Sequence, residues 1–326
     1  EGCHAVLTAV RSCQRSLATA MALGAQFVAF ACVLALIVAA AEGMRTTPLV
    51  IAHRGASMTA PENTMPAFEQ TFLQGGDGFE TDLRTSSDGY IVLVHDSTVD
   101  RTTNCTTLPL PGQCRCGLVN DLTLAELKTC DAGSWFSPEY AGTKIPTLDE
   151  AVELAKQYQG SIVMDLKTDD QAEGLLGAEI EPILTAADYS TYCIPSCWTL
   201  EQAENMKTYL TSSVKQKLGS APTNADESFF SGVIQAGAGG FSASFSTTTP
   251  EFVYSAHKRL MPVYVWTVND PADMEAAFSM GVDGILTDDP ATCVDVVDSL
   301  LSTQCRASYI IPQEATSSPR KLQLDA

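Results

Sequence analysis

The chain has 326 residues, of which 45% are hydrophobic and 18% are charged, a composition typical of one large globular domain or two small ones. Acidic residues outnumber basic ones by 39 to 19, and the resulting net charge of -20 disfavours nucleic acid and anionic membranes as partners. An anionic substrate would therefore need a local positive site, made by a metal ion or by a few placed Lys and Arg side chains.

The first 41 residues differ in composition from the rest of the chain. Residues 21–41 carry no charge, and Gln26 is their only polar side chain. The run ends in small residues, Ala39-Ala40-Ala41, as a signal-peptidase site would. We expect residues 1–41 to be a signal peptide and the protein to be secreted or extracytoplasmic. A signal anchor through residues 21–41 is the alternative, because a run of this length can span a bilayer. Unless the leader is retained in this way, we expect no stable membrane association.

Short apolar runs alternate with helical patterns after this leader. The predicted strands are residues 49–53, 78–83, 90–95, 161–166, 192–195, 214–218, 240–245, 263–268 and 284–287. The predicted helices are residues 64–74, 124–130, 148–157, 174–184, 200–210, 250–257 and 271–280. Strands that alternate with helices indicate a parallel sheet, and about eight such units favour a closed barrel.

We therefore predict the α/β class and a TIM (β/α)8 barrel over residues 46–302, followed by a loose tail at residues 306–326. An open, doubly wound sheet is the alternative fold. It is disfavoured because no glycine-rich dinucleotide fingerprint follows the first predicted strand.

The connection between the second and third predicted strands is too short for a crossover helix. Residues 83–89, if extended, can still return the chain to the bottom of the barrel. We therefore predict a barrel that lacks the helix between its second and third strands. In this prediction residues 86–89 form a turn and residues 90–95 rise parallel to the strand before them.

Eight of the 11 cysteines lie after the leader. They are Cys105, Cys114, Cys116, Cys130, Cys193, Cys197, Cys293 and Cys305. An even set in an exported chain predicts up to four disulfides, most of the thiols oxidised, and at least one bridge between residues 105 and 130. Buried free thiols are the alternative. Zinc ligation by Cys114 and Cys116 is disfavoured because no second cysteine pair or histidine cluster has suitable spacing.

Polar side chains end four of the predicted strands. They are His53 and Arg54, Glu80 and Asp82, His95, and Asp165 and Lys167. In a barrel the carboxyl ends of the strands form one rim, so we expect these side chains to converge there. Three carboxylates at one rim need a cation between them, and carboxylate oxygens suit Mg²⁺ or Ca²⁺ better than zinc. Two histidines beside such a site are a natural acid and base near neutral pH.

The ordered motifs resemble those of the glycerophosphodiester phosphodiesterase family over about residues 48–300. They are His53-Arg54-Gly55, Pro61-Glu62-Asn63-Thr64, Glu80-Thr81-Asp82, His95-Asp96, residues 122–127, 131–136, 145–148 and 265–269, and the run from Gly284 to Asp288. Each tripeptide alone is a weak signal, but the whole set in this order is highly specific.

The resemblance implies that the protein hydrolyses a small-molecule glycerophosphodiester to an alcohol and glycerol 3-phosphate with the help of a divalent metal, Mg²⁺ or Ca²⁺. It implies that Glu80, Asp82 and the carboxylate at position 165 hold the metal, and that His53 and His95 are the acid and the base. In the family's chemistry the glycerol 2-hydroxyl attacks phosphorus while one histidine takes its proton and the other protonates the leaving alcohol.

The same resemblance suggests further substrate-binding residues. Arg54 and Lys167 would contact the phosphate. Glu62 would help to order the site, although it stands where it could equally help to cap the next helix. Apart from the resemblance, Trp266 could line the substrate pocket or fill the top of the barrel, and filling is the favoured alternative.

Asp165 departs from the family pattern, which usually has Glu at this position. The side chain is one methylene shorter, and the related sphingomyelinase D-like enzymes have Asp there. Cleavage of a choline-headgroup lipid, in the manner of a sphingomyelinase D or a lysophospholipase D, is therefore the alternative function. A catalytically inactive barrel used for binding is a second alternative. It is disfavoured because the chain retains every acid and base of the motifs.

Overall fold

The computed structural model describes residues 47–167, 175–210, 217–219 and 225–309. The predicted leader and most of the predicted tail lie outside this part of the chain. Among the described helices, none combines the length and the hydrophobicity that crossing a bilayer requires. The last described helix runs through Tyr309, so the predicted tail begins inside this helix.

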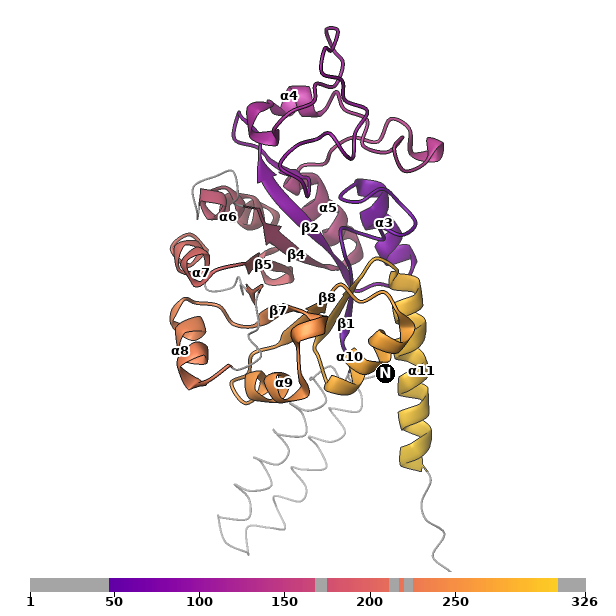
Figure 1. Cartoon of the computed structure of the whole chain (residues 1–326), viewed down its shortest axis with the longest axis vertical. Helices are drawn as coiled ribbons and strands as arrows, with labels where there is room; N and C mark the ends of the chain where they lie inside the picture. Colours follow the sequence, from indigo (N-terminus) through magenta and orange to yellow (C-terminus); the bar gives the residue numbers. More distant parts are fainter. Residues whose placement is uncertain (1–46, 168–174, 211–216, 220–224, 310–326) are drawn as a thin grey trace, which may run out of the picture. The chain divides into compact units, whose positions relative to one another are not determined.

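The described strands form a closed barrel of eight parallel strands, as predicted (Figure 1). They are β1 (Leu49–Ala52), β2 (Gly78–Thr85), β4 (Ser161–Leu166), β5 (Cys193–Cys197), β6 (Lys217–Leu218), β7 (Phe241–Ser244), β8 (Val263–Trp266) and β9 (Gly284–Thr287). The barrel closes because β1 pairs in parallel with both β2 and β9. A side chain at Gly78 would overlap the backbone of Ser161, so only glycine allows β2 and β4 to pair so closely there.

Helices surround the barrel (Figure 1). They are α3 (Met65–Leu73), α5 (Leu148–Tyr158), α6 (Leu175–Ala187), α7 (Leu200–Lys207), α8 (Glu227–Gln235), α9 (Pro250–His257), α10 (Pro271–Met280) and α11 (Pro290–Tyr309). Local sequence fixes several starts, since Thr147 and Thr199 form capping boxes with Glu150 and Gln202. The sequence prediction omits α8 and α11. In α8, Gly232 and neighbouring Phe, Val and Ile residues weaken the helical signal.

Two apolar layers hold the barrel together. The main core lies between the strands and the surrounding helices and includes the stacked rings of Phe68 and Phe79. The second layer fills the barrel interior with Ile51, Val163 and Leu286, together with the ring of Tyr264. Because side chains alternate along a strand, Asp165 on β4 faces inward like Val163, two residues before it, and lies above this interior layer. Glu80 and Asp82, which pair with these two residues from β2, face the same way.

The run at residues 90–95 does not rise parallel to β2, and this part of the fold prediction is wrong. β3 (Ile91–Leu93) pairs antiparallel with the end of β2, so the two strands form a hairpin. The predicted turn at residues 86–89 is present, with the Ser86 amide donating to the Tyr90 carbonyl over 2.9 Å. Because the connection is too short for a crossover, the two strands pair directly in the antiparallel direction. The third barrel strand is β4, which follows α5.

This hairpin returns the chain to the barrel rim from above rather than from below. β2 continues past its pairing with β4, and the extra residues Arg84 and Thr85 pair with β3. The Arg84 side chain is buried and donates to the main-chain carbonyl of His95 from Nε (3.2 Å) and Nη2 (2.9 Å). His95 therefore reaches the predicted rim, although by a route different from the predicted one.

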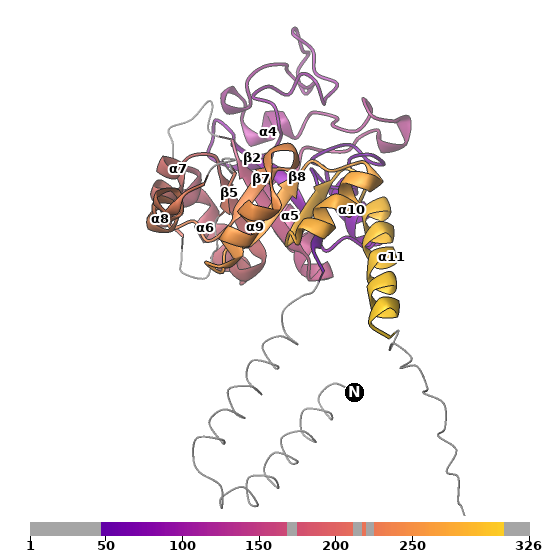
Figure 2. The ribbon, with the colours of Figure 1, turned by 60° about the horizontal axis from the view of Figure 1, so that its bottom comes forward.

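Residues 94–147 form a cap with an apolar core of its own, which includes Val99, Val119 and Leu127. The cap contains η1 (Val119–Asp121), α4 (Leu124–Leu127) and η2 (Pro138–Tyr140). Figures 1 and 2 show this α4-bearing segment beyond the C-terminal end of β2. The cap thus lies at the end of the barrel where the polar strand ends meet.

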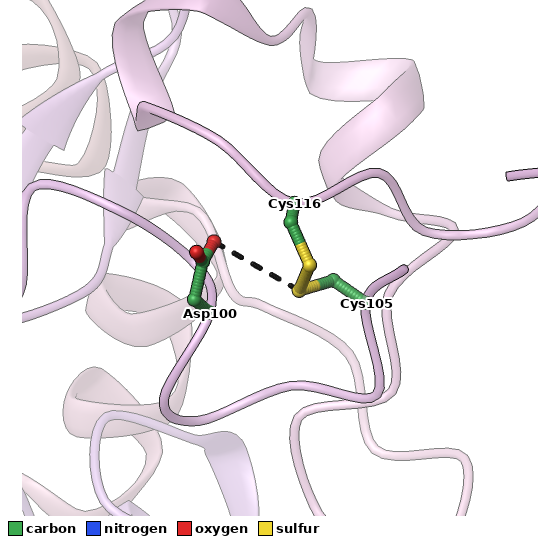
Figure 3. A group of neighbouring side chains, drawn as sticks. All are labelled: Asp100, Cys105 and Cys116. Atoms are coloured by element: carbon green, nitrogen blue, oxygen red, sulfur yellow. Dashed lines mark hydrogen bonds between the residues drawn. A yellow bond between two sulfur atoms is a disulfide. The ribbon is translucent and has the colours of Figure 1, made fainter. Parts of the chain in front are cut away.

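Two disulfides join segments of the cap, as the cysteine pattern predicts. Cys105 bonds to Cys116, beside the carboxylate of Asp100 (Figure 3), and Cys114 bonds to Cys130. Because the sulfur atoms of Cys114 and Cys116 are oxidised, they offer no thiolate to a metal.

The expectation that most cysteines are oxidised is wrong for the barrel. Cys193, Cys197 and Cys293 are buried thiols. Cys193 and Cys197 stand four residues apart on β5, about 13 Å along an extended strand and too far for a disulfide. The side chain of Cys305 lies outside the described residues.

Candidate active site

Three carboxylates meet at the C-terminal end of the barrel. Glu80 and Asp82 come from β2, and Asp165 lies opposite Asp82 on β4. One oxygen of each lies within 4.8 Å of the others, and all three residues are at least nine-tenths buried. Burial first, and then the charge of Asp82, raise the pKa of Glu80 to about 8. An all-oxygen set under such repulsion fits a hard divalent cation such as Mg²⁺ or Ca²⁺.

Two basic side chains border these carboxylates. Lys167 Nζ lies 2.6 Å from Asp165 Oδ2 and 3.0 Å from Asp82 Oδ1. The Arg54 amide donates to Glu80 over 2.9 Å, and its Nε lies 3.5 Å from Asp82 Oδ2. Burial alone would raise the pKa of Asp82, but the charges of Lys167 and Arg54 hold that pKa below its usual value. The sequence prediction therefore placed both basic residues in the same cluster as the three acids.

A tight turn after β1 aims the Arg54 amide at the cluster. Arg54 and Gly55 both have positive φ angles, of 58° and 79°. A side chain at position 55 would overlap Ala67 of α3, so this turn requires glycine. The His-Arg-Gly run therefore shapes the backbone turn and also supplies the side chains of His53 and Arg54 to the site.

Asn63 holds Asp82 in place, a role that sequence reasoning missed. Its Nδ2 donates to Asp82 Oδ2 over 2.7 Å, and its Oδ1 accepts from the Asp82 amide and from Thr81 Oγ1. Thr64 is the N-cap of α3, without a side-chain hydrogen bond, while Asn63 faces β2. The Pro-Glu-Asn-Thr motif contains Asn63, but Asp82 lies 19 residues further along the chain, so the motif alone did not reveal their contact.

His53 follows β1 and lines the cavity beside the carboxylates. Its Nδ1 forms a 2.7 Å hydrogen bond with Asp288 Oδ1. Asp288 also accepts from Ser57 Oγ (3.0 Å) and Asn269 Nδ2 (2.6 Å), which fixes the carboxylate. Burial by itself lowers the pKa of His53, but the bond to Asp288 and the charge of Glu80 outweigh it and raise the pKa above 6.5.

His95 lines the same cavity and is held by a second carboxylate. Its Nδ1 forms a 2.8 Å hydrogen bond with Asp96 Oδ1. Arg101 donates to Asp96 over 2.7 and 3.0 Å, and the same guanidinium donates to Glu62 over 2.8 Å from two nitrogens. Arg101 is exposed, and the charge pattern gave no signal that it would join these acids.

Glu62 belongs to this network rather than to a helix cap. It accepts from Arg54 Nη1 over 2.9 Å as well as from Arg101. Burial alone would raise its pKa, but the hydrogen bond with Arg101 and the charge of Arg54 hold the pKa below its usual value. Glu62 therefore orients Arg54. Through Arg101 it also connects Arg54 to Asp96, the carboxylate that holds His95.

The cavity enclosed by these groups has a volume of about 180 Å³. Trp198 and Trp266 form one wall, with ring centroids 5.7 Å apart in an edge-to-face arrangement. Trp266 also donates from Nε1 to the Ser242 carbonyl over 2.8 Å. Both alternatives for Trp266 therefore apply in part, since it lines the cavity and packs on the interior layer. Trp198 was missed because a tryptophan after a short strand has no distinctive spacing.

The arrangement is suited to acid–base chemistry on a small anionic substrate. His53 and His95 each engage a carboxylate through Nδ1, which leaves Nε2 for a substrate. Arg54 and Lys167 supply positive charge, and three buried carboxylates offer a cation site in the same cavity. All of the residues predicted for the site are thus either in the cavity wall or, for Glu62, one hydrogen bond from it.

Comparisons with known proteins agree with this geometry. The model of the glycerophosphoryl diester phosphodiesterase family matches residues 53–292. A glycerophosphodiester phosphodiesterase from Caldanaerobacter subterraneus is 34% identical over 257 residues, which cover 76% of this chain and 97% of that protein. An Oleispira antarctica phosphodiesterase, solved in complex with the product sn-glycerol-3-phosphate, superposes with a TM-score of 0.67 at 28% identity and covers 77% of this chain and 97% of its own. The glycerophosphodiester phosphodiesterase from Agrobacterium tumefaciens has the same fold, with a TM-score of 0.63 at 23% identity over 76% of this chain and 99% of its own.

Proposed function

The chain belongs to the glycerophosphoryl diester phosphodiesterase family, and from this premise we propose that it hydrolyses glycerophosphodiesters to an alcohol and glycerol 3-phosphate with a divalent metal and two histidines. It is a phosphoric diester hydrolase with a TIM-barrel fold. The observation that carries the finer proposal is the convergence, in one cavity, of three carboxylates and two carboxylate-backed histidines.

Glu80, Asp82 and Asp165 are the proposed metal ligands. Their oxygens suit Mg²⁺ or Ca²⁺, and the repulsion among three buried acids is relieved when a cation is bound. A divalent ion held there supplies positive charge that stabilises the phosphate in the transition state. Asn63 keeps the Asp82 carboxylate in register with the other two.

His53 is proposed as the base and His95 as the acid. With Nδ1–H directed to Asp288, the His53 ring presents an unprotonated Nε2 that can take the proton of the glycerol 2-hydroxyl. His95, bonded through Nδ1 to Asp96, can deliver a proton from Nε2 to the oxygen of the leaving alcohol. An acid and a base require opposite protonation states, so in this proposal the two rings differ by one proton when the substrate binds.

Arg54 and Lys167 are proposed to contact the phosphate. Both lie at the cavity, and each forms an ion pair with a carboxylate, Arg54 with Glu62 and Lys167 with Asp165. Because the neighbouring acids fix these cations before a substrate arrives, their charge needs little reorganisation when an anionic diester binds.

The size of the cavity favours a small diester. Its volume of about 180 Å³ is below the roughly 300–1,000 Å³ of pockets that enclose drug-sized ligands. A glycerophosphodiester with a compact alcohol suits this space better than a long-chain lipid does. The alternative of a choline-headgroup lipid, raised by Asp165, therefore stays second.

We also propose that the enzyme works outside the cytosol. The apolar run at residues 21–41 has the composition of a signal peptide. Support comes from the two disulfides of the cap, since such bonds persist in oxidising compartments.

Product analysis tests the proposed reaction. Purified protein would be incubated with glycerophosphocholine, glycerophosphoethanolamine and a lysophospholipid, and the products followed by phosphorus NMR. We expect glycerol 3-phosphate from the two small diesters and a much slower reaction with the lipid. Release of phosphocholine, which requires cleavage of the other ester bond, or preferred cleavage of the lipid would contradict the proposal.

A further inference from the structure

Trp198 forms a hydrogen bond with one of the proposed metal ligands, although neither its position nor its type marks it as functional in the sequence. Its indole Nε1 donates to Asp165 Oδ1 over 2.6 Å. The other oxygen, Oδ2, is bound by Lys167. Each carboxylate oxygen has a further lone pair, so Asp165 can still bind a cation while both partners remain in place.

The backbone around Trp198 is built to hold the indole in this position. Trp198 stands between the end of β5 and the start of α7. Its amide donates to Gln202 Oε1 over 2.6 Å, and Gln202 also completes the capping box with Thr199. Trp266 packs edge to face against this ring in the same cavity wall. The start of a helix thus determines where the indole N–H points.

The chemistry of the two donors to Asp165 differs. Lys167 is a cation, so its bond weakens the attraction of the carboxylate for a metal ion. An indole N–H is a neutral donor at every pH, and it orients a carboxylate while leaving its full negative charge in place. Hydrogen bonds of this kind to a metal ligand commonly change metal affinity by about 10- to 100-fold.

We propose that Trp198 is a positioning residue for the metal centre, which fixes the short side chain of Asp165 so that its free lone pairs face Glu80 and Asp82. The inference rests on the metal dependence proposed above. Because Asp165 is one methylene shorter than Glu, its carboxylate reaches less far into the cavity, and its orientation is correspondingly more important. Loss of the indole N–H should therefore weaken metal binding without disturbing the barrel.

The variant Trp198→Phe tests this directly, since it keeps an aromatic ring in the wall and removes the N–H. The metal affinity of the full chain, stripped with chelator, would be measured by calorimetry with Mg²⁺ and with Ca²⁺. We expect affinity about 10-fold weaker or more for the variant, with an unchanged unfolding temperature of the metal-free protein. At saturating metal, its kcat should recover towards that of the unaltered enzyme.

Trp266→Phe is the matched control, because it removes an indole N–H from the same wall, but one that donates to the Ser242 carbonyl instead of a carboxylate. Its metal affinity should equal that of the unaltered chain. Equal affinity in Trp198→Phe, or an equal loss in both variants, would overturn the inference while leaving the proposed function intact. If the unaltered chain itself bound neither ion, the proposed metal dependence would fall, and this inference with it.

Discussion

The two histidines of the cavity share one arrangement at the residue scale. Each uses Nδ1 to bond a carboxylate, Asp288 for His53 and Asp96 for His95. The environments differ, because His53 is the more enclosed of the two and lies close enough to Glu80 for its charge to raise the pKa. This difference in surroundings is what can separate a base from an acid in one site.

Replacement of Asp288 by Asn should move the acid side of the pH–rate profile. His53 acts as a base only when neutral, so kcat/KM falls as the pH drops through its pKa. Asp288 raises that pKa against the effect of burial. Without the carboxylate the pKa falls, and the acid limb should shift to lower pH while the overall rate decreases. The measurement is kcat/KM from about pH 5 to 9.

Asp283→Asn provides a control of the same chemistry, because Asp283 pairs with the exposed His257 outside the cavity. Its acid limb should stay in place. An acid limb that does not move in Asp288→Asn would argue against His53 as the base.

His95→Ala should show a loss that depends on the leaving group. A general acid matters most when the departing alcohol is poor, so activity on glycerophosphocholine should fall by about 10²- to 10⁴-fold. A nitrophenyl ester releases nitrophenolate, which departs without a proton, so this substrate should restore part of the activity. His53→Ala lacks its base and should not be rescued. Equal, unrescued losses in both variants, or near-normal activity in either, would contradict this division of roles.

At the scale of elements, the sequence predicted what depends on local pattern. Apolar runs located all eight barrel strands, and two-residue spacing correctly placed Glu80 beside Asp82 on one face. The sequence pattern did not predict the antiparallel pairing of β3, because the same short connection allows either a return to the bottom of the barrel or a hairpin. Long-range hydrogen bonds decided between them. For the same reason the partners of distant residues, such as Asn63 and Trp198, could not be predicted from spacing.

The two disulfides should stabilise the cap without affecting the metal ligands. Loops of 11 and 16 residues predict a loss of about 3 kcal/mol in the free energy of unfolding for each bridge replaced by a pair of serines. Loss of the Cys114–Cys130 bridge should reduce kcat more, because both of its cysteines are buried in the cap core, whereas Cys105 and Cys116 are only partly buried. Metal affinity should not change, since its ligands lie on barrel strands. Denaturant unfolding and calorimetry check both points, and unaltered stability in either variant would contradict the expected role.

At the scale of the whole molecule, charge and cavity select for a small soluble substrate. A net charge of -20 gives no general attraction for an anionic diester, so affinity must come from the local cations at the cavity. Arg54 and Lys167 are the proposed cations, and each is paired with a carboxylate before a substrate binds. In this proposal, affinity for the diester depends on a few residues at the cavity and not on a charged surface.

The proposed export predicts a processed chain. Expression in a host with a secretory pathway should yield a mature protein that begins near Glu42, with the Cys105–Cys116 and Cys114–Cys130 bridges formed and Cys193 and Cys293 reduced. Mass spectrometry of the intact protein and of its unreduced peptides gives both results. An intact leader on the released protein would count against cleavage.

The central claim is that three carboxylates and two histidines act together on a glycerophosphodiester through a bound metal. Hydrolysis of glycerophosphocholine should be followed in the purified enzyme after chelation, after return of Mg²⁺ or Ca²⁺, and in Glu80→Gln under both conditions. We predict that chelation abolishes the release of glycerol 3-phosphate, that the metal restores it, and that Glu80→Gln is folded yet slower by several orders of magnitude at every metal concentration. Full activity in excess chelator, or unimpaired turnover by Glu80→Gln, would contradict the account.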